Sequence, residues 1–222
     1  MKAVYIISVI IIIISIITAV YFYQYMPDRM AIHWNSRGDV DDYTSKFLGL
    51  FLIPIISVVC FLLFIFIPKL DPLKKNFKKF EDYYDFFIFV FLLFLLYLFI
   101  LTIMWNLGYY FNMMSMIIPS FALLFYCIGV LIHHAKQNWF VGIRTPWTLS
   151  NEEVWNKTHR VGGILFRIVA FISLFGLLFP RYAFIIFILL VIFVIIFIMI
   201  YSYIEYRKTE TLKQKKMRKI IK

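Results

Sequence analysis

Cysteine is scarce in this chain, and so is charge. Both cysteines of the 222 residues, Cys60 and Cys127, fall inside long apolar runs, which excludes a disulfide framework and a C-x-x-C metal site. Only 16% of the residues are charged, whereas 63% are hydrophobic and the mean hydropathy is +0.86, so the chain is not a soluble globular domain. The sequence also lacks a G-x-S-x-G elbow and an H-x3-H pair, which are patterns of serine hydrolases and helical zinc sites.

Apolar sequence is what the chain has in abundance. Six runs approach or exceed the ~20 residues that a helix needs to cross a ~30 Å hydrocarbon layer. The first run follows Lys2 and is longer than the core of a signal peptide, so we predict a retained membrane helix. The expected fold is an all-α integral membrane protein with about six transmembrane helices and no separate soluble domain. The expected spans are residues 3–25, 47–67, 86–105, 115–135, 161–179 and 182–204.

Lysine and arginine are distributed unevenly among the loops. Of the 23 basic residues, one lies at the N-terminus, five in residues 68–85, four in residues 136–160 and eight from Arg207 onward. The opposite loops hold four, and Arg167 lies inside a span. The positive-inside rule therefore predicts a multi-pass cell-membrane protein with both termini and the 136–160 loop in the cytoplasm. The formal charge of +11 is attributed to topology and to anionic lipid headgroups, and no direct contact with nucleic acid is predicted.

The predicted spans differ in how many polar residues they contain. Spans three and six contain almost no polar groups and are expected to face lipid. Span five contains glycines, a serine and Arg167, and is expected to line the bundle interior. Arg167 lies about 10 Å into its span and is expected to snorkel to the interface or to pair with an acid in residues 81–85.

The predicted organisation of the chain has four parts. These are a two-span module (1–67) with an outer loop (26–46), a cytoplasmic loop (68–85), a four-span region (86–204) with a second cytoplasmic loop (136–160), and a basic cytoplasmic tail (205–222).

The outer loop, residues 26–46, is rich in polar and aromatic side chains. The run I-H-W-N at residues 32–35, followed by Gly38, indicates a strand-like segment that enters a glycine turn. Trp34 and Tyr43 suit the aromatic belt at the headgroup level. Four aspartates occur here without the glycine and terminal glutamate of an EF-hand, so no metal site is predicted. The loop is interpreted either as a structural turn or as a recognition surface for an extracellular ligand.

This loop resembles a widespread membrane module of unknown function, found near the N-terminus of many small bacterial and archaeal membrane proteins. That family usually has a second proline just before the apolar–histidine pair, whereas this chain has Ala31. The positions that carry the resemblance are Pro27, Ile32, His33, Trp34, Asn35, Gly38, Asp41, Tyr43 and Lys46.

Residues 138–163, here called the signature stretch, form a long polar interruption between apolar spans: N-W-F-V-G-I-R-T-P-W-T-L-S-N-E-E-V-W-N-K-T-H-R-V-G-G. Ser150 and Glu153 have the spacing of a capping box, which predicts a helix that begins at Asn151 and continues into the fifth span. The residue before Pro146 avoids the helical region, so an extended or turned segment is expected there. The apolar start of the stretch is expected to lie at the interface or to fold back against the bundle.

Three chemical hypotheses for the signature stretch stand beside a structural one. Glu152 and His159 lie on one helical face and are a candidate acid–base pair. His133 and His134 end the fourth span and could approach His159 as zinc ligands. Arg144 near a helix N-terminus would bind an anion. The structural alternative is that the stretch braces the fourth span against the fifth.

The signature stretch is similar to the signature of the SdpI-like membrane proteins. Their pattern is G-[IVL]-R-[TL]-P-W-T-L, followed by V-W-x-x-T-H-R and a glycine. Glu152 lies between the two halves of the pattern and is kept as a further candidate functional residue. The matching positions are Gly142, Arg144, Thr145, Pro146, Trp147, Thr148, Leu149, Trp155, Thr158, His159, Arg160 and Gly162.

This resemblance implies a polytopic protein that confers immunity to a secreted antimicrobial peptide and, in some members, signals the presence of the peptide to a cytosolic repressor. A peptide arriving from outside would not meet the signature stretch first, so that stretch is interpreted as a brace or an output surface. Two rival functions stay open: a membrane enzyme acting on a lipid or phosphorylated substrate through His159, Arg144 and Glu152, and a small transporter. No cofactor is predicted for any of them.

Overall fold

Six long apolar helices form the framework of the protein. The computed structural model describes residues 3–220, with side chains as far as Gln214. Each long helix is apolar enough to cross a bilayer, so the chain is an all-α multi-pass membrane protein apart from one small hairpin. The long helices are α1 (Ala3–Phe22), α2 (Lys46–Leu70), α4 (Glu81–Asn106), α5 (Met113–His134), α7 (Glu152–Leu174) and α8 (Pro180–Ile220).

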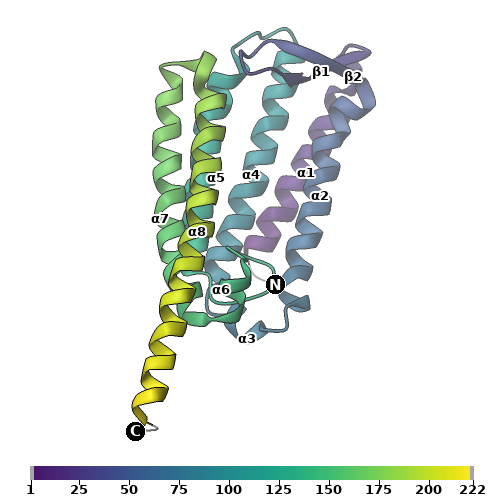
Figure 1. Cartoon of the computed structure of the whole chain (residues 1–222). Coiled ribbons are helices and arrows are strands. Elements are labelled where there is room, and N and C mark those ends of the chain that lie inside the picture. The colour runs from purple at the N-terminus through teal and green to yellow at the C-terminus, as the bar shows by residue number, and fades with distance from the viewer. Residues whose placement is uncertain (1–2, 221–222) are drawn as a thin grey trace.

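Short elements close the two ends of the bundle. One end, called the hairpin end, is covered by the β1–β2 hairpin. The other, called the loop end, contains α3, α6 and both ends of the described chain (Figure 1). An even number of spans places both ends of the chain on the same side of the membrane. That this side is the cytoplasm is a prediction from the loop charges. The short elements are η1 (Tyr23–Tyr25), β1 (Arg29–Trp34), β2 (Val40–Ser45), α3 (Lys74–Phe77), α6 (Pro146–Ser150) and η2 (Phe175–Leu177).

The helix α4 is the centre of the bundle. It packs on α1, α2 and α5, while α7 and α8 pack with α5 on the far side (Figure 1). Of the most apolar 18-residue window of each helix, 44% is buried in α4, 28% in α7 and 17% in α8. The prediction that α8 faces lipid is therefore consistent with its burial. The prediction that span three faces lipid was wrong. Span five lines the interior, as predicted, along the face that holds Gly162, Gly163 and Ser173, which are buried. Ile88, Leu92 and Phe99 of α4 are fully buried among other apolar side chains, and composition does not separate a protein-facing apolar residue from a lipid-facing one.

Two helices approach each other unusually closely. A Cβ atom on Gly163 of α7 would lie 2.7 Å from the carbonyl oxygen of Gly129 on α5, a distance that real Cβ atoms do not tolerate. Small residues at such a crossing let the backbones meet, which is a common way to join helices where lipid removes the hydrophobic driving force. The α5–α7 pair is therefore a rigid unit, and α8 packs against it through Val194 and Ile198.

Candidate functional site

The hairpin turn is held in one conformation. The side-chain oxygen of Asn35 accepts hydrogen bonds from the backbone N–H groups of Arg37 and Asp39 at 2.8 and 3.2 Å. Gly38 has a φ of +86°, as the predicted glycine turn requires. The side chain of Asn112, which caps the start of α5, donates to the Arg37 carbonyl at 3.2 Å. The predicted strand and glycine turn are thus confirmed, and the turn is tied to α5.

A second asparagine joins the hairpin to α4. The Asn106 side chain accepts from the N–H of Ala31 at 2.8 Å and donates to its carbonyl oxygen at 3.0 Å. A proline at position 31 has no N–H and would lose the first of these bonds. Ala31 therefore keeps a hydrogen bond to α4 that the proline usual in the resembled module could not make.

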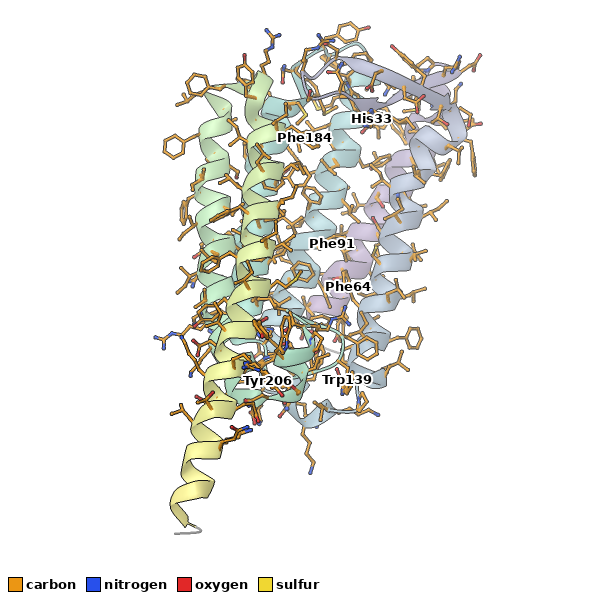
Figure 2. The ribbon with its side chains drawn as sticks, viewed as in Figure 1. His33, Phe64, Phe91, Trp139, Phe184 and Tyr206 are labelled. Carbon is orange, nitrogen blue, oxygen red and sulfur yellow. The ribbon has the colours of Figure 1, made fainter. Side chains whose placement is uncertain are left out.

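A partly open cavity of about 390 Å³ lies beneath the hairpin, between α2, α4, α5 and α8. Its hairpin side is polar and its deeper walls are apolar. His33 and Phe184, from the hairpin and from α8, lie at this end of the bundle (Figure 2). The size and the apolar lining with few polar groups are those of a ligand pocket. Its lining includes His33, Trp34, Asn35, Thr102, Ile117 and Phe184.

The predicted outer-loop residues have different roles in the hairpin. His33 is held by a 2.5 Å contact from its Nδ1 to the Asp41 carboxylate. Trp34 packs edge-on against Trp105 of α4, with 5.7 Å between ring centroids. Pro27 lies in the connection between η1 and β1, and Tyr43 stands exposed on β2 opposite Ala31. The motif therefore shapes the hairpin, and three of its residues, His33, Trp34 and Asn35, line the cavity.

At the loop end, Asn138 organises the first part of the signature stretch. Its side chain is fully buried and makes four hydrogen bonds, donating to the carbonyls of Lys136 and Val141 and accepting from the N–H groups of Phe140 and Val141. Of the two placements expected for the apolar start of the stretch, the structure shows the one in which it folds back onto the bundle, with Val141 packed against the main core.

The buried carboxylate of Asp71 connects the two loops of this end. One oxygen accepts from the N–H of Leu73 at 2.7 Å and the other from the N–H of Trp139 at 2.9 Å. The neighbouring Gln137 donates to the carbonyls of Thr148 and Leu149. Loop 68–80 and the signature stretch are thus one hydrogen-bonded layer.

His159 pins the middle of the signature stretch to α7. Its Nδ1 lies 2.9 Å from the Trp155 carbonyl, and its Nε2 accepts the N–H of Ile143 at 3.0 Å. Because one nitrogen faces an acceptor and the other a donor, these contacts fit a neutral imidazole. The ring stacks on Trp155 at 3.8 Å, and Trp155 donates to the Ala135 carbonyl of the α5 end. Both nitrogens are therefore engaged by backbone, and neither is left to exchange a proton with Glu152.

Gly142 makes this contact possible. Its φ is +116°, which favours glycine, and a Cβ atom there would lie 2.4 Å from the His159 ring. Thr158, next to His159, is fully buried without a hydrogen bond to its hydroxyl within the described side chains. Gly162 faces the Ile143 side chain one turn further along.

The capping box lies one element earlier than predicted. Thr145 and Thr148 form it, each side chain bonding the backbone N–H of the other, and α6 begins at Pro146. Ser150 instead donates to the Trp147 carbonyl and ends α6. Asn151 caps α7, because its side-chain oxygen accepts from the N–H groups of Glu153 and Val154, and the helix begins at Glu152. Asparagine competes effectively with serine as a cap, which the spacing alone did not reveal.

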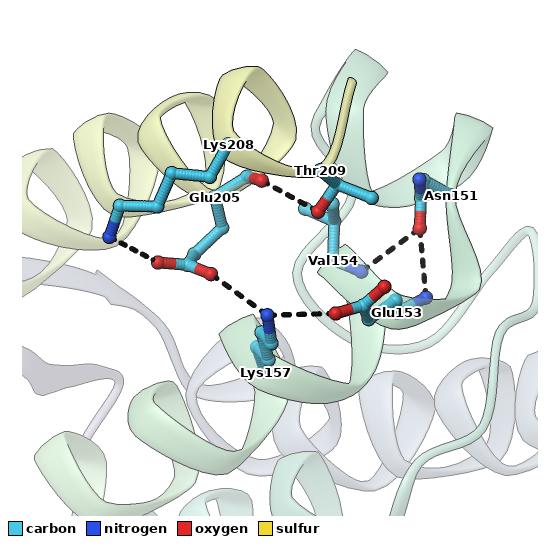
Figure 3. A network of polar contacts seen from close by, with 7 residues as sticks. All are labelled: Asn151, Glu153, Val154, Lys157, Glu205, Lys208 and Thr209. Atoms are coloured by element: carbon cyan, nitrogen blue, oxygen red, sulfur yellow. Dashed lines mark hydrogen bonds and ion pairs between the residues drawn. The ribbon is translucent and has the colours of Figure 1, made fainter. Parts of the chain in front are cut away.

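Contacts to α8 hold the signature stretch from the side. The Thr145 hydroxyl bonds Ser202 at 3.2 Å, and Trp147 packs on Tyr203. Further along, Lys157 lies between Glu153 at 2.8 Å and the buried Glu205 of α8 at 3.2 Å (Figure 3).

The remaining candidate residues do not converge. Arg144 is exposed and donates to the Trp139 carbonyl at 2.8 Å, so the anion site imagined at a helix N-terminus is not formed by it. Glu152 and Arg160 are exposed on α7. His134 stacks on Tyr83 of α4. Within the described residues, the histidines are not gathered with other ligands into a group that could hold a metal.

The anchoring residues Asn106, Asn112, Asp71, Gln137 and Glu205 escaped the sequence analysis. Their common signal is a single amide or carboxylate at or near the boundary of a long apolar run, where a loop has to be fastened to the bundle. That signal is readable only once the partner backbone is known.

Comparison with known proteins accounts for both ends. A family model described as the SdpI/YfhL protein family matches residues 134–202, and a domain of unknown function, DUF1648, matches residues 10–58. The immunity protein SdpI of Bacillus subtilis (strain 168) is 29% identical over 204 residues, which cover 91% of this chain and 96% of that protein. The chain is thus similar to the SdpI-like proteins over most of its length. No solved structure matches it. The SdpI-like match includes the signature stretch and most of α8, the DUF1648 match includes the hairpin, and this SdpI-like chain is a multi-pass cell-membrane protein.

Proposed function

We propose that this SdpI-like chain protects its host against a secreted antimicrobial peptide. The observation that carries the proposal is the match to an immunity protein along nearly the whole length of both chains. This homology supports a membrane immunity function. The rival enzymatic function would need a reactive group in the signature stretch, and His159 has both nitrogens bonded to backbone.

The cavity beneath the hairpin is the proposed contact site for the peptide. The loop charges predict that the hairpin end faces outward, where a secreted peptide arrives. An apolar side chain of the peptide would enter between α2, α4, α5 and α8, and its backbone would meet the polar edge at His33 and Asn35. The rigid hairpin, tied to α4 by Asn106 and to α5 by Asn112, would limit the cost of ordering on binding.

Signalling to a cytosolic repressor is the finer part of the proposal. α8 continues for 41 residues, about 60 Å at 1.5 Å per residue, which is more than a bilayer requires. Figure 1 shows its C-terminal part projecting beyond the rest of the loop end. Tyr203, Arg207 and Leu212 line an open groove on this helix, which would be available as an output surface together with the signature stretch.

Complementation tests the immunity proposal. The chain is expressed in a Bacillus subtilis strain that lacks SdpI, and survival is measured in the presence of peptide-producing cells. Protection is expected from the wild-type chain and not from Ile117→Phe, which places extra bulk in the cavity while leaving the loop end unchanged. The proposed function would be rejected if the wild-type chain is present in the membrane and protects neither against the peptide of these cells nor against a panel of other secreted peptides.

A further inference from the structure

Arg167 carries a positive charge inside the bundle without an acidic partner. Its Nε donates to the Gly163 carbonyl at 3.0 Å, and no ion pair reaches it among the side chains of residues 3–214. The predicted pairing with an acid of residues 81–85 is therefore wrong for this structure. An arginine in a membrane span is costly unless its guanidinium reaches the interface or an anion.

The side chain of Arg167 is directed along α7 toward its N-terminal end. Its Cγ lies against Gly129 of α5, and its Nε bonds Gly163 one turn earlier. Arg160 lies two turns earlier, about 10 Å away along the axis and on the same face of the helix. Arg160 is exposed and is likewise without an ion pair within the described side chains. His133 of α5 packs against Gly163, which lies between the two arginines along α7.

Beyond Arg167, in the opposite direction, the α5–α7 seam is hollowed. A groove of about 330 Å³ begins at Ala170, three residues after Arg167, and runs toward the hairpin end. Leu123 and Phe171 line it with exposed side chains, and Tyr126 packs edge-on against Phe171. A strip of apolar surface thus leads directly to a pair of uncompensated cations.

We propose that this seam binds one anionic phospholipid, with its phosphate at Arg160 and Arg167 and an acyl chain in the groove. Charge decides the occupant: a zwitterionic lipid carries its own cation, and the same face of a second copy would bring two more arginines. Arginine matches phosphate oxygens with paired N–H donors. By the loop charges, the arginine end of the groove faces the cytoplasmic leaflet, where anionic lipid attracts basic residues. The inference does not depend on the immunity function.

Lipid competition on the purified full-length protein tests the proposal. Delipidated protein in detergent receives equal amounts of dioleoyl phosphatidylglycerol and dioleoyl phosphatidylcholine, and the bound ratio is read by native mass spectrometry. Wild-type protein is expected to retain phosphatidylglycerol selectively. Arg160→Gln and Arg167→Gln should each lower that selectivity about five-fold, the effect of one basic residue near an anionic surface, whereas Arg167→Lys should keep most of it.

Arg181→Gln is the matched control, because it removes one arginine at the hairpin end of α8. It should leave the selectivity unchanged, and an excess of inorganic phosphate should not displace the lipid. Equal binding of the two lipids to wild-type protein, an equal loss in Arg181→Gln, or displacement by phosphate would each overturn the proposal. Arg160 is exposed on the helix surface, so its variant reports on binding even where Arg167→Gln fails to fold.

Discussion

Two histidines illustrate how the ends of this bundle differ. At the hairpin end, the His33 side chain is 65% exposed and lines a cavity of about 390 Å³. At the loop end, His159 is 1% exposed, stacks on Trp155 and bonds backbone through both nitrogens. Both residues belong to motifs that the sequence singled out as candidate functional sites. In the structure, one is available to a ligand and the other is occupied by the fold.

The contrast extends to the surrounding polar groups. Asn106 and Asn112 fasten the hairpin at two points and leave space beneath it. Asn138 and Asp71 instead close the loop end into a layer in which side chains satisfy backbone. Buried polar networks that are fully satisfied confer rigidity. The loop end is therefore expected to govern stability and the hairpin end to govern protection.

The largest effect on stability is expected from Gly142→Ala. The new Cβ would lie 2.4 Å from His159 and would also require an unfavourable φ of +116°, at a cost on the order of 4 kcal/mol. Gly108→Ala is the matched control, because φ is +95° there but a Cβ meets nothing within 4 Å. Thermal unfolding in detergent, followed by circular dichroism, should show a much smaller loss for the control. Equal losses would mean that the His159 contact contributes nothing.

Replacing each histidine by alanine separates the two ends. His159→Ala removes the ring stacked on Trp155 and leaves the Ile143 N–H unpaired, which should lower the free energy of unfolding by about 3 kcal/mol. His33→Ala should leave the melting temperature nearly unchanged and reduce survival in the peptide challenge. The comparison breaks if His159→Ala abolishes protection while the protein keeps wild-type stability, because that result would indicate a chemical role.

Local signals in the sequence were sufficient for the spans and the hairpin turn. A run of ~20 apolar residues has few alternatives to a membrane helix, and Gly38 after a strand-like segment requires a turn. The central position of α4 was not predictable, since Ile88 and Leu92 would suit lipid equally well. The role of His159 depends on a contact with Ile143, which lies sixteen residues earlier in the chain and folds back onto α7 together with Gly142. Residue spacing in the sequence does not encode such a tertiary contact.

Asn106 and Ala31 should show a coupled loss at the hairpin end. Asn106→Ala removes two hydrogen bonds to the Ala31 backbone and should cost about 2 kcal/mol. Ala31→Pro removes one of these bonds through its missing N–H. In a double-mutant cycle, the two losses should fall short of additivity by about 1 kcal/mol. Additive losses would show that the hydrogen bonds between Asn106 and Ala31 do not hold the hairpin.

The smallest effect is expected at the ion pair between α7 and α8. Lys157 is 44% exposed on its side chain, and solvent screens its contact with the buried Glu205 (Figure 3). Lys157→Met should therefore lower the free energy of unfolding by only about 0.5 kcal/mol, and by less at high salt. Glu210→Gln, which removes an exposed pair with Lys213 on the projecting part of α8, is the control and should have no measurable effect. A loss as large as that of His159→Ala would contradict this expectation and would show that the ion pair to α8 is a main source of stability at the loop end. A small loss would place that stability in the backbone contacts of Asn138, Asp71 and His159.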